Sequence, residues 1–410
     1  MKSRSLFLQL WLAIVFTMFS AIPVMSQTKD DTILDSLEIS LLTCDPHQEI
    51  YSLYGHTAIR CRNTLTGDDF VVNYGVFNFN QPHFVLRFVF GLTDYSMGVY
   101  SFSDFKREYS YYKSSVTQQV LNLTPQEKAN IMHALEQNAR QPIYRYNYFY
   151  DNCTTRARDM LVNHLEGKVD YQTIADSTAT FRNMIHSCNE EHPWARFGND
   201  MLLGVAADRS TDLSEQQFLP VHLKDHFAHA VIIDADGQKR PLVSRTDTVV
   251  NGGLQVVESE FPLRPSHCFL LLLALICVVV LVEWKRHTTL WGFDLLLLLT
   301  AGLAGLVLTM MIFSHHPTVS FNLLILMLNP LPLLFAVPVA RSAHKGHVHR
   351  WWYVWAALIV MCIAGGFFQK YAEGMYILAL SLLIRCVSNI FSKGKRNSVA
   401  NDVIVTKNRK

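Results

Sequence analysis

Five long apolar runs after residue 262 limit the folds that this chain can adopt more than any other feature. Each is near the length that an α-helix needs to cross the roughly 30 Å hydrocarbon core of a bilayer. The 410-residue chain is also 50% hydrophobic and only 17% charged, which is too apolar for an ordinary soluble protein. We therefore predict five transmembrane helices, within residues 268–282, 290–313, 319–340, 351–368 and 374–391.

The charges between these runs predict how the chain is oriented. Lys and Arg accumulate on the cytoplasmic side of membrane proteins. Here they follow the first, third and fifth runs, at Lys285, Arg286, Arg341, Lys345, Arg350, Lys393, Lys395 and Arg396. The two alternate connections, SHHPTVS and QKYAEG, contain a single Lys. This pattern places the long N-terminal region outside the cytoplasm and the C-terminus inside it.

The first 26 residues have the composition of an export signal. Two basic residues precede an apolar stretch that starts at Leu6, and Val24 and Ser26 have the spacing of a cleavage site. An uncleaved anchor helix is the alternative interpretation. We divide the chain into a signal peptide (1–26), an exported globular domain (27–262), a five-helix membrane domain (263–392) and a basic cytoplasmic tail (393–410).

Charge and motifs exclude several classes of partner. The formal net charge is +2, and the basic residues form no continuous face, so we do not expect nucleic acid to bind. No HExxH, CxxC or phosphate-loop motif is present. The histidine-rich segment at 344–349 fits an interfacial anchor better than a metal site. We expect neither a metal nor a nucleotide cofactor.

Local patterns predict mixed α and β structure in the exported domain. Short apolar alternation indicates strands at 36–44, 57–63 and 70–79. Thr124, Pro125 and Glu127 form the start of a helix with a capping box. A second helix is expected to begin at Cys153, capped by Asp151 or Asn152, and to end at Gly167.

Cys153 is the main candidate for a reactive group. Four cysteines fall in the exported domain, where oxidising conditions allow two disulfides, so a bridge is the simpler interpretation; they are Cys44, Cys61, Cys153 and Cys188. The first turn of a helix, however, favours a thiolate, as do Arg156 and Arg158 nearby. Its free N–H groups can also stabilise an oxyanion.

A nucleophilic thiol needs a base and a group that orients the base. His56 follows Gly55 at the start of a strand, where histidine is unusual for packing and glycine lets another backbone approach closely. Asn73, in the next predicted strand, is the first candidate for the orienting group, and Asp69 is the second. The candidate catalytic residues are therefore Cys153, His56 and Asn73.

A histidine on an early strand, a polar residue on the next strand and Asn-Cys at a helix start resemble circularly permuted papain-like hydrolases of the NlpC and lecithin:retinol acyltransferase types. The set YSLYGHTAIR, VVNYGVFNF, FVFGLTDYSMG, YDNCTTRARD and FLPVHL, followed by a membrane tail with SHHPTVSFNLL, is similar to the Lnb family of lipoprotein N-acyltransferases over nearly the whole mature chain. The resemblance implies an α+β permuted papain-like domain in the periplasm, followed by an all-α domain in the bacterial inner membrane.

The resemblance also implies a reaction. Cys153 would take an acyl chain from a phospholipid with His56 as base, and the α-amine of a diacylated lipoprotein would then accept it. The apolar segment 84–102 could lie against membrane lipid and pass the chain to the site, or it could belong to the core. A thiol peptidase or amidase on cell-wall peptides and a non-catalytic envelope sensor remain alternatives.

Polar groups in the membrane domain are further candidates, because such groups are costly in lipid. His315 and His316, in the second external connection, are candidate substrate-binding residues. The third run is interrupted by Asn322, Asn329 and Pro330. Asp294 and Arg385 are expected to reach the cytoplasmic surface, and His133, His164 and His186 to be surface residues.

Overall fold

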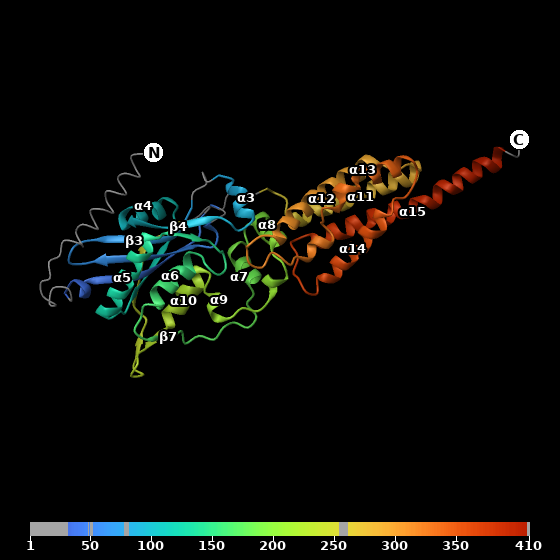
Figure 1. Ribbon diagram of the computed structural model, residues 1–410. Coiled ribbons are helices and arrows are strands. Elements are labelled where there is room, and N and C mark those ends of the chain that lie inside the picture. The colour runs from blue at the N-terminus through green and yellow to red at the C-terminus, as the bar shows by residue number, and fades with distance from the viewer. Residues whose placement is uncertain (1–31, 48, 50–51, 78–81, 254–260, 408–410) are drawn as a thin grey trace.

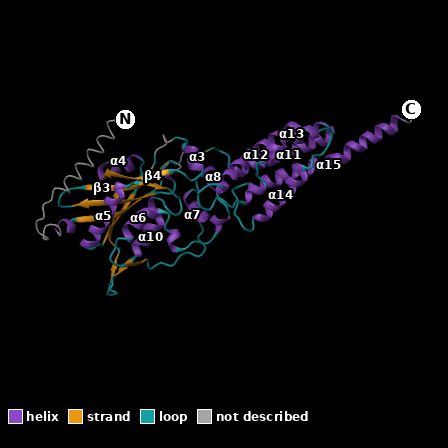
Figure 2. Ribbon diagram, in the orientation of Figure 1, coloured by secondary structure: helices purple, strands orange, loops and turns teal. Residues whose placement is uncertain are grey.

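The computed structural model describes residues 32–47, 49, 52–77, 82–253 and 261–407. The predicted signal peptide, 1–26, lies outside the described residues. The molecule is elongated, with a sheet-containing domain at one end and a bundle of helices at the other (Figure 1). Strands are confined to the N-terminal domain, and the C-terminal part is helical (Figure 2).

A seven-stranded antiparallel sheet forms the centre of the N-terminal domain. Its strand order is β10-β5-β1-β2-β3-β4-β6. The strands are β1 (Leu37–Cys44), β2 (His56–Asn63), β3 (Asp69–Val76), β4 (Asp94–Ser101), β5 (Val116–Leu121), β6 (Ile143–Arg145) and β10 (Val243–Val250). The first three strands predicted from the sequence are confirmed, within a few residues at their ends.

Helices cover both faces of this sheet. On one face, Leu41 and other buried strand residues pack against α5 (Pro125–Arg140), α6 (Cys153–Val162) and α10 (Pro220–His229). The next residue, Leu42, points to the opposite face and packs with Phe105 and Tyr109 of α4 (Phe102–Tyr111). This alternation is the period-2 pattern of a strand that is buried on both faces.

The two predicted helix starts are confirmed, but one predicted end is wrong. Both hydrogen bonds of the capping box between Thr124 and Glu127 are present at the start of α5. The helix α6 begins at Cys153 but ends at Val162, not at Gly167. Gly167 instead precedes β7, where a Cβ would lie 2.6 Å from the carbonyl oxygen of Ile233. A close backbone approach, rather than a helix end, accounts for this glycine.

Smaller elements complete the N-terminal domain outside the central sheet. They are the three-stranded sheet β7 (Lys168–Asp170), β8 (Val231–Ile233) and β9 (Lys239–Pro241), and the helices α7 (Phe181–Cys188), α8 (Pro193–Leu202), η2 (Val205–Asp208) and α9 (Leu213–Gln216). Fully buried Arg182 connects α7, α8 and η2 through ion pairs with Asp200 and Asp208, at 2.7 and 2.8 Å. His186 bonds Asp200 at 2.8 Å and is half-buried, so the prediction that it lies on the surface is wrong.

The C-terminal domain contains three helical segments that are long and apolar enough to cross a membrane, and two shorter apolar helices. The long segments are Pro265–Arg286, Trp291–Ile312 and Leu323–His344, and the shorter helices are Trp351–Gly365 and Met375–Phe391. The three long segments are α11, α12, and η3 together with α13. The two shorter helices are α14 and the first half of α15 (Met375–Lys407). The third segment is interrupted as predicted, because η3 (Leu323–Leu326) ends before Pro330 caps α13 (Leu331–His344).

The prediction that Asp294 and Arg385 reach the cytoplasmic surface is wrong. Both side chains are fully buried, and Arg385 Nε donates to Asp294 at 2.5 Å. Arg385 also bonds Glu283 at 2.6 Å, so the guanidinium links α15 to both α11 and α12. Charges in an apolar bundle need such pairing, and this cluster supplies it inside the protein.

Candidate active site

Asn152 fixes the start of α6 and thereby the position of Cys153. Its Oδ1 accepts the backbone N–H groups of Thr154 and Thr155, each at 2.9 Å. Its Nδ2 donates to the carbonyl oxygens of Tyr148 and Phe218 at 3.0 and 2.9 Å. Of the two cap residues considered from the sequence, the structure uses Asn152. An almost buried cap with both ends bonded holds the following residue in place.

The cap leaves one useful backbone donor. The N–H groups of Thr154 and Thr155 are occupied by Asn152, whereas the N–H of Cys153 has no acceptor among the residues that the structure describes. It points out of the N-terminal end of α6, where the helix dipole is positive. A developing oxyanion next to the Cys153 sulfur could therefore accept this hydrogen bond.

His56 and Asn73 are brought together by the register of two strands. Ala58 of β2 pairs with Asn73 of β3, which places the His56 side chain diagonally beside that of Asn73. His56 Nε2 lies 3.1 Å from Asn73 Oδ1. The amide oxygen accepts a hydrogen bond from the Nε2–H group, which leaves Nδ1 free for a second partner.

Asp69 does not take part in this arrangement. It lies at the other end of β3, where it accepts hydrogen bonds from Nε and an Nη of Arg60 at 2.8 and 2.6 Å. The glycine before His56 has the role expected from the sequence. Gly55 has a φ of +74°, and a Cβ there would lie 2.8 Å from the carbonyl oxygen of Cys44.

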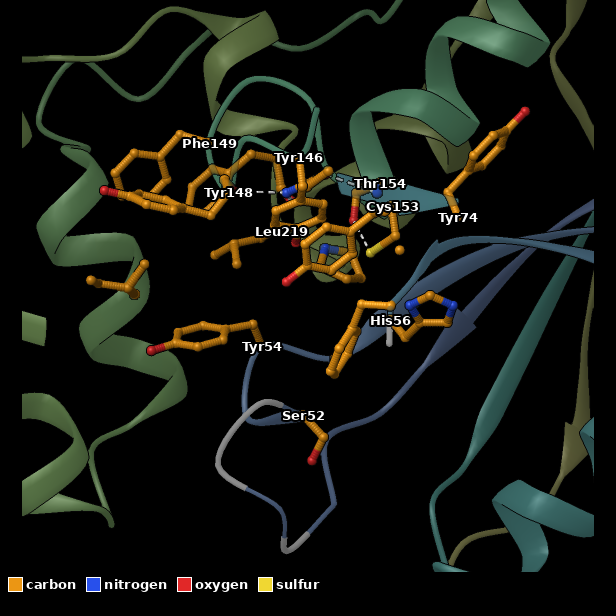
Figure 3. Close-up of a pocket in the computed structure, with 18 of the residues that line it drawn as sticks. Ser52, Tyr54, His56, Tyr74, Tyr146, Tyr148, Phe149, Cys153, Thr154 and Leu219 are labelled. Atoms are coloured by element: carbon orange, nitrogen blue, oxygen red, sulfur yellow. Dashed lines mark hydrogen bonds between the residues drawn. The ribbon is translucent and has the colours of Figure 1, made fainter. Parts of the chain in front are cut away.

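Cys153 and His56 lie near each other and line the same cavity, and the Cys153 sulfur lies 3.8 Å from the Thr154 hydroxyl (Figure 3). Burial alone would raise the pKa of the thiol, but the charge and hydrogen bond of His56, the Thr57 N–H and the Thr154 hydroxyl lower it to about 7. Burial likewise opposes the charged imidazole, yet the Cys153 charge and the hydrogen bonds of Cys153 and Asn73 raise the pKa of His56. Each group therefore favours the charged form of the other, as in a thiolate–imidazolium pair.

The two arginines expected to support the thiolate have other partners. Arg156 bonds Asp151 and stacks on the Tyr144 ring, with the guanidinium 3.5 Å from the ring centroid. Arg158 bonds Asp159 and the Ser214 region of α9. The sequence analysis instead missed Thr57 and Thr154, whose hydroxyls lie 3.1 Å apart beside the sulfur. Threonine is common in strands and helix starts, so no sequence signal marks these two.

No disulfide competes for the thiol. All eight cysteines lie in the described part of the chain and are free. Cys44 and Cys61 are fully buried in the two sheet cores, and Cys188 is half-buried in α7. The interpretation of Cys153 as half of a bridge is therefore wrong.

A cavity of about 610 Å³ joins these residues to the membrane domain. This is within the usual size range of ligand pockets. Aromatic side chains line much of the cavity, including Tyr146, Tyr148 and Phe149 (Figure 3). The wall farther from the thiol is apolar and includes Met311, at the end of α12, and Val319.

The two histidines of the external connection occupy different positions. His316 lines the cavity and packs at a tilt against Tyr148, with ring centroids 5.0 Å apart. Burial lowers its pKa, which favours the neutral ring. His315 is exposed and does not line the cavity, and its backbone N–H bonds Phe90.

Comparison with protein families identifies both halves of the chain. A model of the Lnb N-terminal periplasmic domain matches residues 25–187, and a model of the Lnb transmembrane domain matches residues 256–397. The chain belongs to the Lnb family. As an Lnb protein it is an inner-membrane protein with a periplasmic N-terminal domain of sheet-rich α+β fold, followed by a helical membrane domain. No curated protein and no solved structure matches the chain.

Proposed function

We propose that this Lnb protein is a lipoprotein N-acyltransferase that carries the acyl chain as a thioester on Cys153. The observation that best supports this is the cavity, which holds Cys153, His56 and Asn73 at one end and is lined by α12 of the membrane domain at the other. A soluble peptide substrate has no need of such a connection. A phospholipid donor and a lipid-anchored acceptor are both confined to the membrane, which raises their local concentration at the cavity.

The first half-reaction transfers the acyl chain from phospholipid to enzyme. The Cys153 thiolate attacks the ester carbonyl carbon, and the oxyanion accepts the Cys153 N–H. When the tetrahedral intermediate collapses, the carbon–oxygen ester bond breaks and the His56 imidazolium protonates the leaving lysophospholipid oxygen. The products are an acyl thioester and a lysophospholipid.

The second half-reaction transfers the chain to the lipoprotein. The α-amine of the diacylglyceryl cysteine attacks the thioester carbonyl, and neutral His56 takes the proton that the nitrogen loses. The carbon–sulfur bond then breaks, which forms the amide and regenerates the thiolate–imidazolium pair. Asn73 keeps the ring oriented throughout, because its Oδ1 accepts a hydrogen bond from the Nε2–H group. The apolar wall keeps water from the thioester.

The arrangement is consistent with a permuted papain-like fold, since the histidine strand precedes the cysteine helix in the chain. The five apolar segments would then be five membrane crossings, with residues 27–262 in the periplasm and 393–410 in the cytoplasm. A phosphatase fused after residue 410 should stay inactive in cells, whereas one fused near Pro262 should be active. The reverse result would contradict this topology.

Mass spectrometry of lipoprotein N-terminal peptides tests the function. Cells with the protein should contain N-acylated peptides, and cells without it should not. Restoring the wild-type gene should restore the acyl chain, while Cys153→Ser and His56→Ala variants at equal protein level should not. Normal N-acylation with either variant would exclude the mechanism, and N-acylated peptides in cells without the protein would favour a sensor or a cell-wall amidase.

A further inference from the structure

The short helix α3 (Phe84–Val89) exposes apolar side chains beside the membrane domain. Leu86 is 50% exposed, Phe88 47% and Leu92, just beyond the helix, 37%. A soluble domain rarely exposes several large apolar residues together unless they contact a partner or a membrane. The strand β4, which follows, belongs to the central sheet, so only α3 of the apolar segment 84–102 is free to contact lipid.

α3 is held firmly at the external end of α12. Ser314 Oγ donates to the Val89 carbonyl at 2.7 Å, and the His315 N–H donates to the Phe90 carbonyl at 2.9 Å. Gly91 has a φ of +66°, and a Cβ there would lie 2.8 Å from the His316 backbone nitrogen. Only glycine permits this approach, so the position of α3 against the membrane domain is built into the chain.

The exposed face of α3 continues an apolar collar around the external ends of the membrane helices. The collar consists of Leu86, Phe88, Leu92, Phe313, Phe321, Phe367 and Phe368, of which the last four are 66–91% exposed. Phe313 follows α12, Phe321 precedes η3, and Phe367 and Phe368 follow α14. Large apolar side chains at the ends of membrane helices are typical of the interfacial zone of a bilayer.

α3 also borders the reaction cavity, and Phe88 belongs to both the exposed surface and the cavity wall. Phe88 and Val89 line it together with Met311 and Val319, and the same cavity contains Cys153. The helix therefore separates the thiol from the surface where the collar would meet lipid. The seam between α3 and the end of α12, where Ser314 bonds Val89, borders the cavity, because Val89 and Met311 both line it.

We propose that α3 lies in the external leaflet of the membrane and that its seam with α12 is the portal through which a phospholipid acyl chain reaches Cys153. This inference rests on the proposed acyltransferase function. It adds the route by which the donor enters and the leaflet from which it comes. A lipid occupant is favoured over a protein because four of the collar residues lie within a few residues of the ends of the apolar membrane-domain helices.

A photo-crosslinking experiment tests the position of α3 without requiring activity. A benzophenone amino acid replaces Leu86 in the full-length protein, which is reconstituted in phospholipid vesicles and irradiated. The matched control is Leu65, which is 63% exposed on the turn between β2 and β3, far from the membrane domain. Mass spectrometry should find a phospholipid adduct at position 86 and none at 65. Equal adducts at both positions, or only protein adducts at 86, would overturn the proposal.

A kinetic experiment tests the portal itself. Leu86→Glu should slow formation of acyl-Cys153 from vesicle phospholipid by at least about tenfold, equivalent to about 1.4 kcal/mol, because it places a charge where the chain must pass. The reaction with a small water-soluble ester should be unchanged, and Leu65→Glu should leave both rates unchanged. Equal slowing of both donors by Leu86→Glu, or no slowing of either, would contradict the portal. If the wild type forms no acyl-Cys153 from either donor, the proposed function fails, and the position-86 adduct still decides where α3 lies.

Discussion

Replacing His56 by Gln is expected to shift the ionisation of Cys153 upward and to slow its alkylation near neutral pH. The thiol has a pKa of about 7 in place of its ordinary 9.0. This difference corresponds to about 2.7 kcal/mol in favour of the thiolate. His56 supplies both the charge and the hydrogen bond that outweigh burial, so its removal should return the pKa to 9 or above.

The size of the effect follows from two opposing factors. At pH 7 about half of the Cys153 thiol is ionised, against about 1% of an unperturbed thiol, which is a roughly 50-fold advantage. A thiolate of lower pKa is less nucleophilic, by about six- to tenfold for two pKa units. The net advantage at pH 7 is therefore about five- to eightfold. His56→Gln should remove all of it.

The assay is alkylation by iodoacetamide from pH 5 to 10, with mass spectrometry of the peptide that contains Cys153. The reagent is small, so the aromatic walls of the cavity hinder it little. Cys188 is the internal control, because burial raises the pKa of this half-buried thiol and His56 is not among the groups that influence it. A wild-type midpoint at 9 or above would refute the ion pair, and so would the same midpoint in His56→Gln with an unchanged Cys188 rate.

Three further variants test the surroundings of the site. Asn73→Ala should slow acyl-Cys153 formation about tenfold and leave KM unchanged, because it removes one hydrogen bond of about 1.5 kcal/mol. An unchanged kcat would exclude the orienting role. Asp200→Asn leaves Arg182 poorly paired, so it should lower the free energy of unfolding by about 3 kcal/mol. The apparent Tm in detergent at pH 7 should fall accordingly. Burial opposes the Asp200 charge, but His186 and Arg182 lower the pKa of this carboxyl group, so the stabilisation is present above the ordinary carboxyl pKa and is lost as pH falls. The Tm difference between wild type and Asp200→Asn should therefore shrink at pH 4 or below. A constant difference would contradict the pairing. Gly204→Val places a Cβ against the Phe321 carbonyl oxygen, and should therefore loosen the junction of the two domains. Cleavage by protease in this region should increase. An unchanged cleavage pattern would show that the junction tolerates the larger side chain.

The candidate site could be predicted largely because its residues have local signatures. The helix start at Cys153 follows from a capping residue before it, and the structure places the cysteine there. The choice of Asn73 over Asp69 was also within reach of the sequence. A turn at 64–68 sets the hairpin register, which pairs Arg62 with Asp69 and brings Asn73 next to the His56 end.

The remaining features depend on contacts between distant parts of the chain. Arg156 was expected to support the thiolate because it is close in sequence, but a helix turns its side chain toward Asp151 and Tyr144. Arg385 was expected to reach the surface, but Asp294 and Glu283 come from other helices to pair with it. The cavity likewise needs walls from both domains, and no single segment encodes it.

The most direct test follows the acyl group itself. The full-length protein is incubated with phospholipid vesicles, quenched in acid and digested, and the peptide containing Cys153 is analysed by mass spectrometry. We expect a hydroxylamine-sensitive acyl group on Cys153, together with released lysophospholipid. When a diacylglyceryl-cysteine peptide is added, the acyl group should leave Cys153, and the same chain should appear on the α-amine of the peptide. Transfer of the chain to the acceptor by a Cys153→Ser variant, or transfer by the wild type without any acyl-Cys153 when the acceptor is withheld, would contradict a thioester on Cys153.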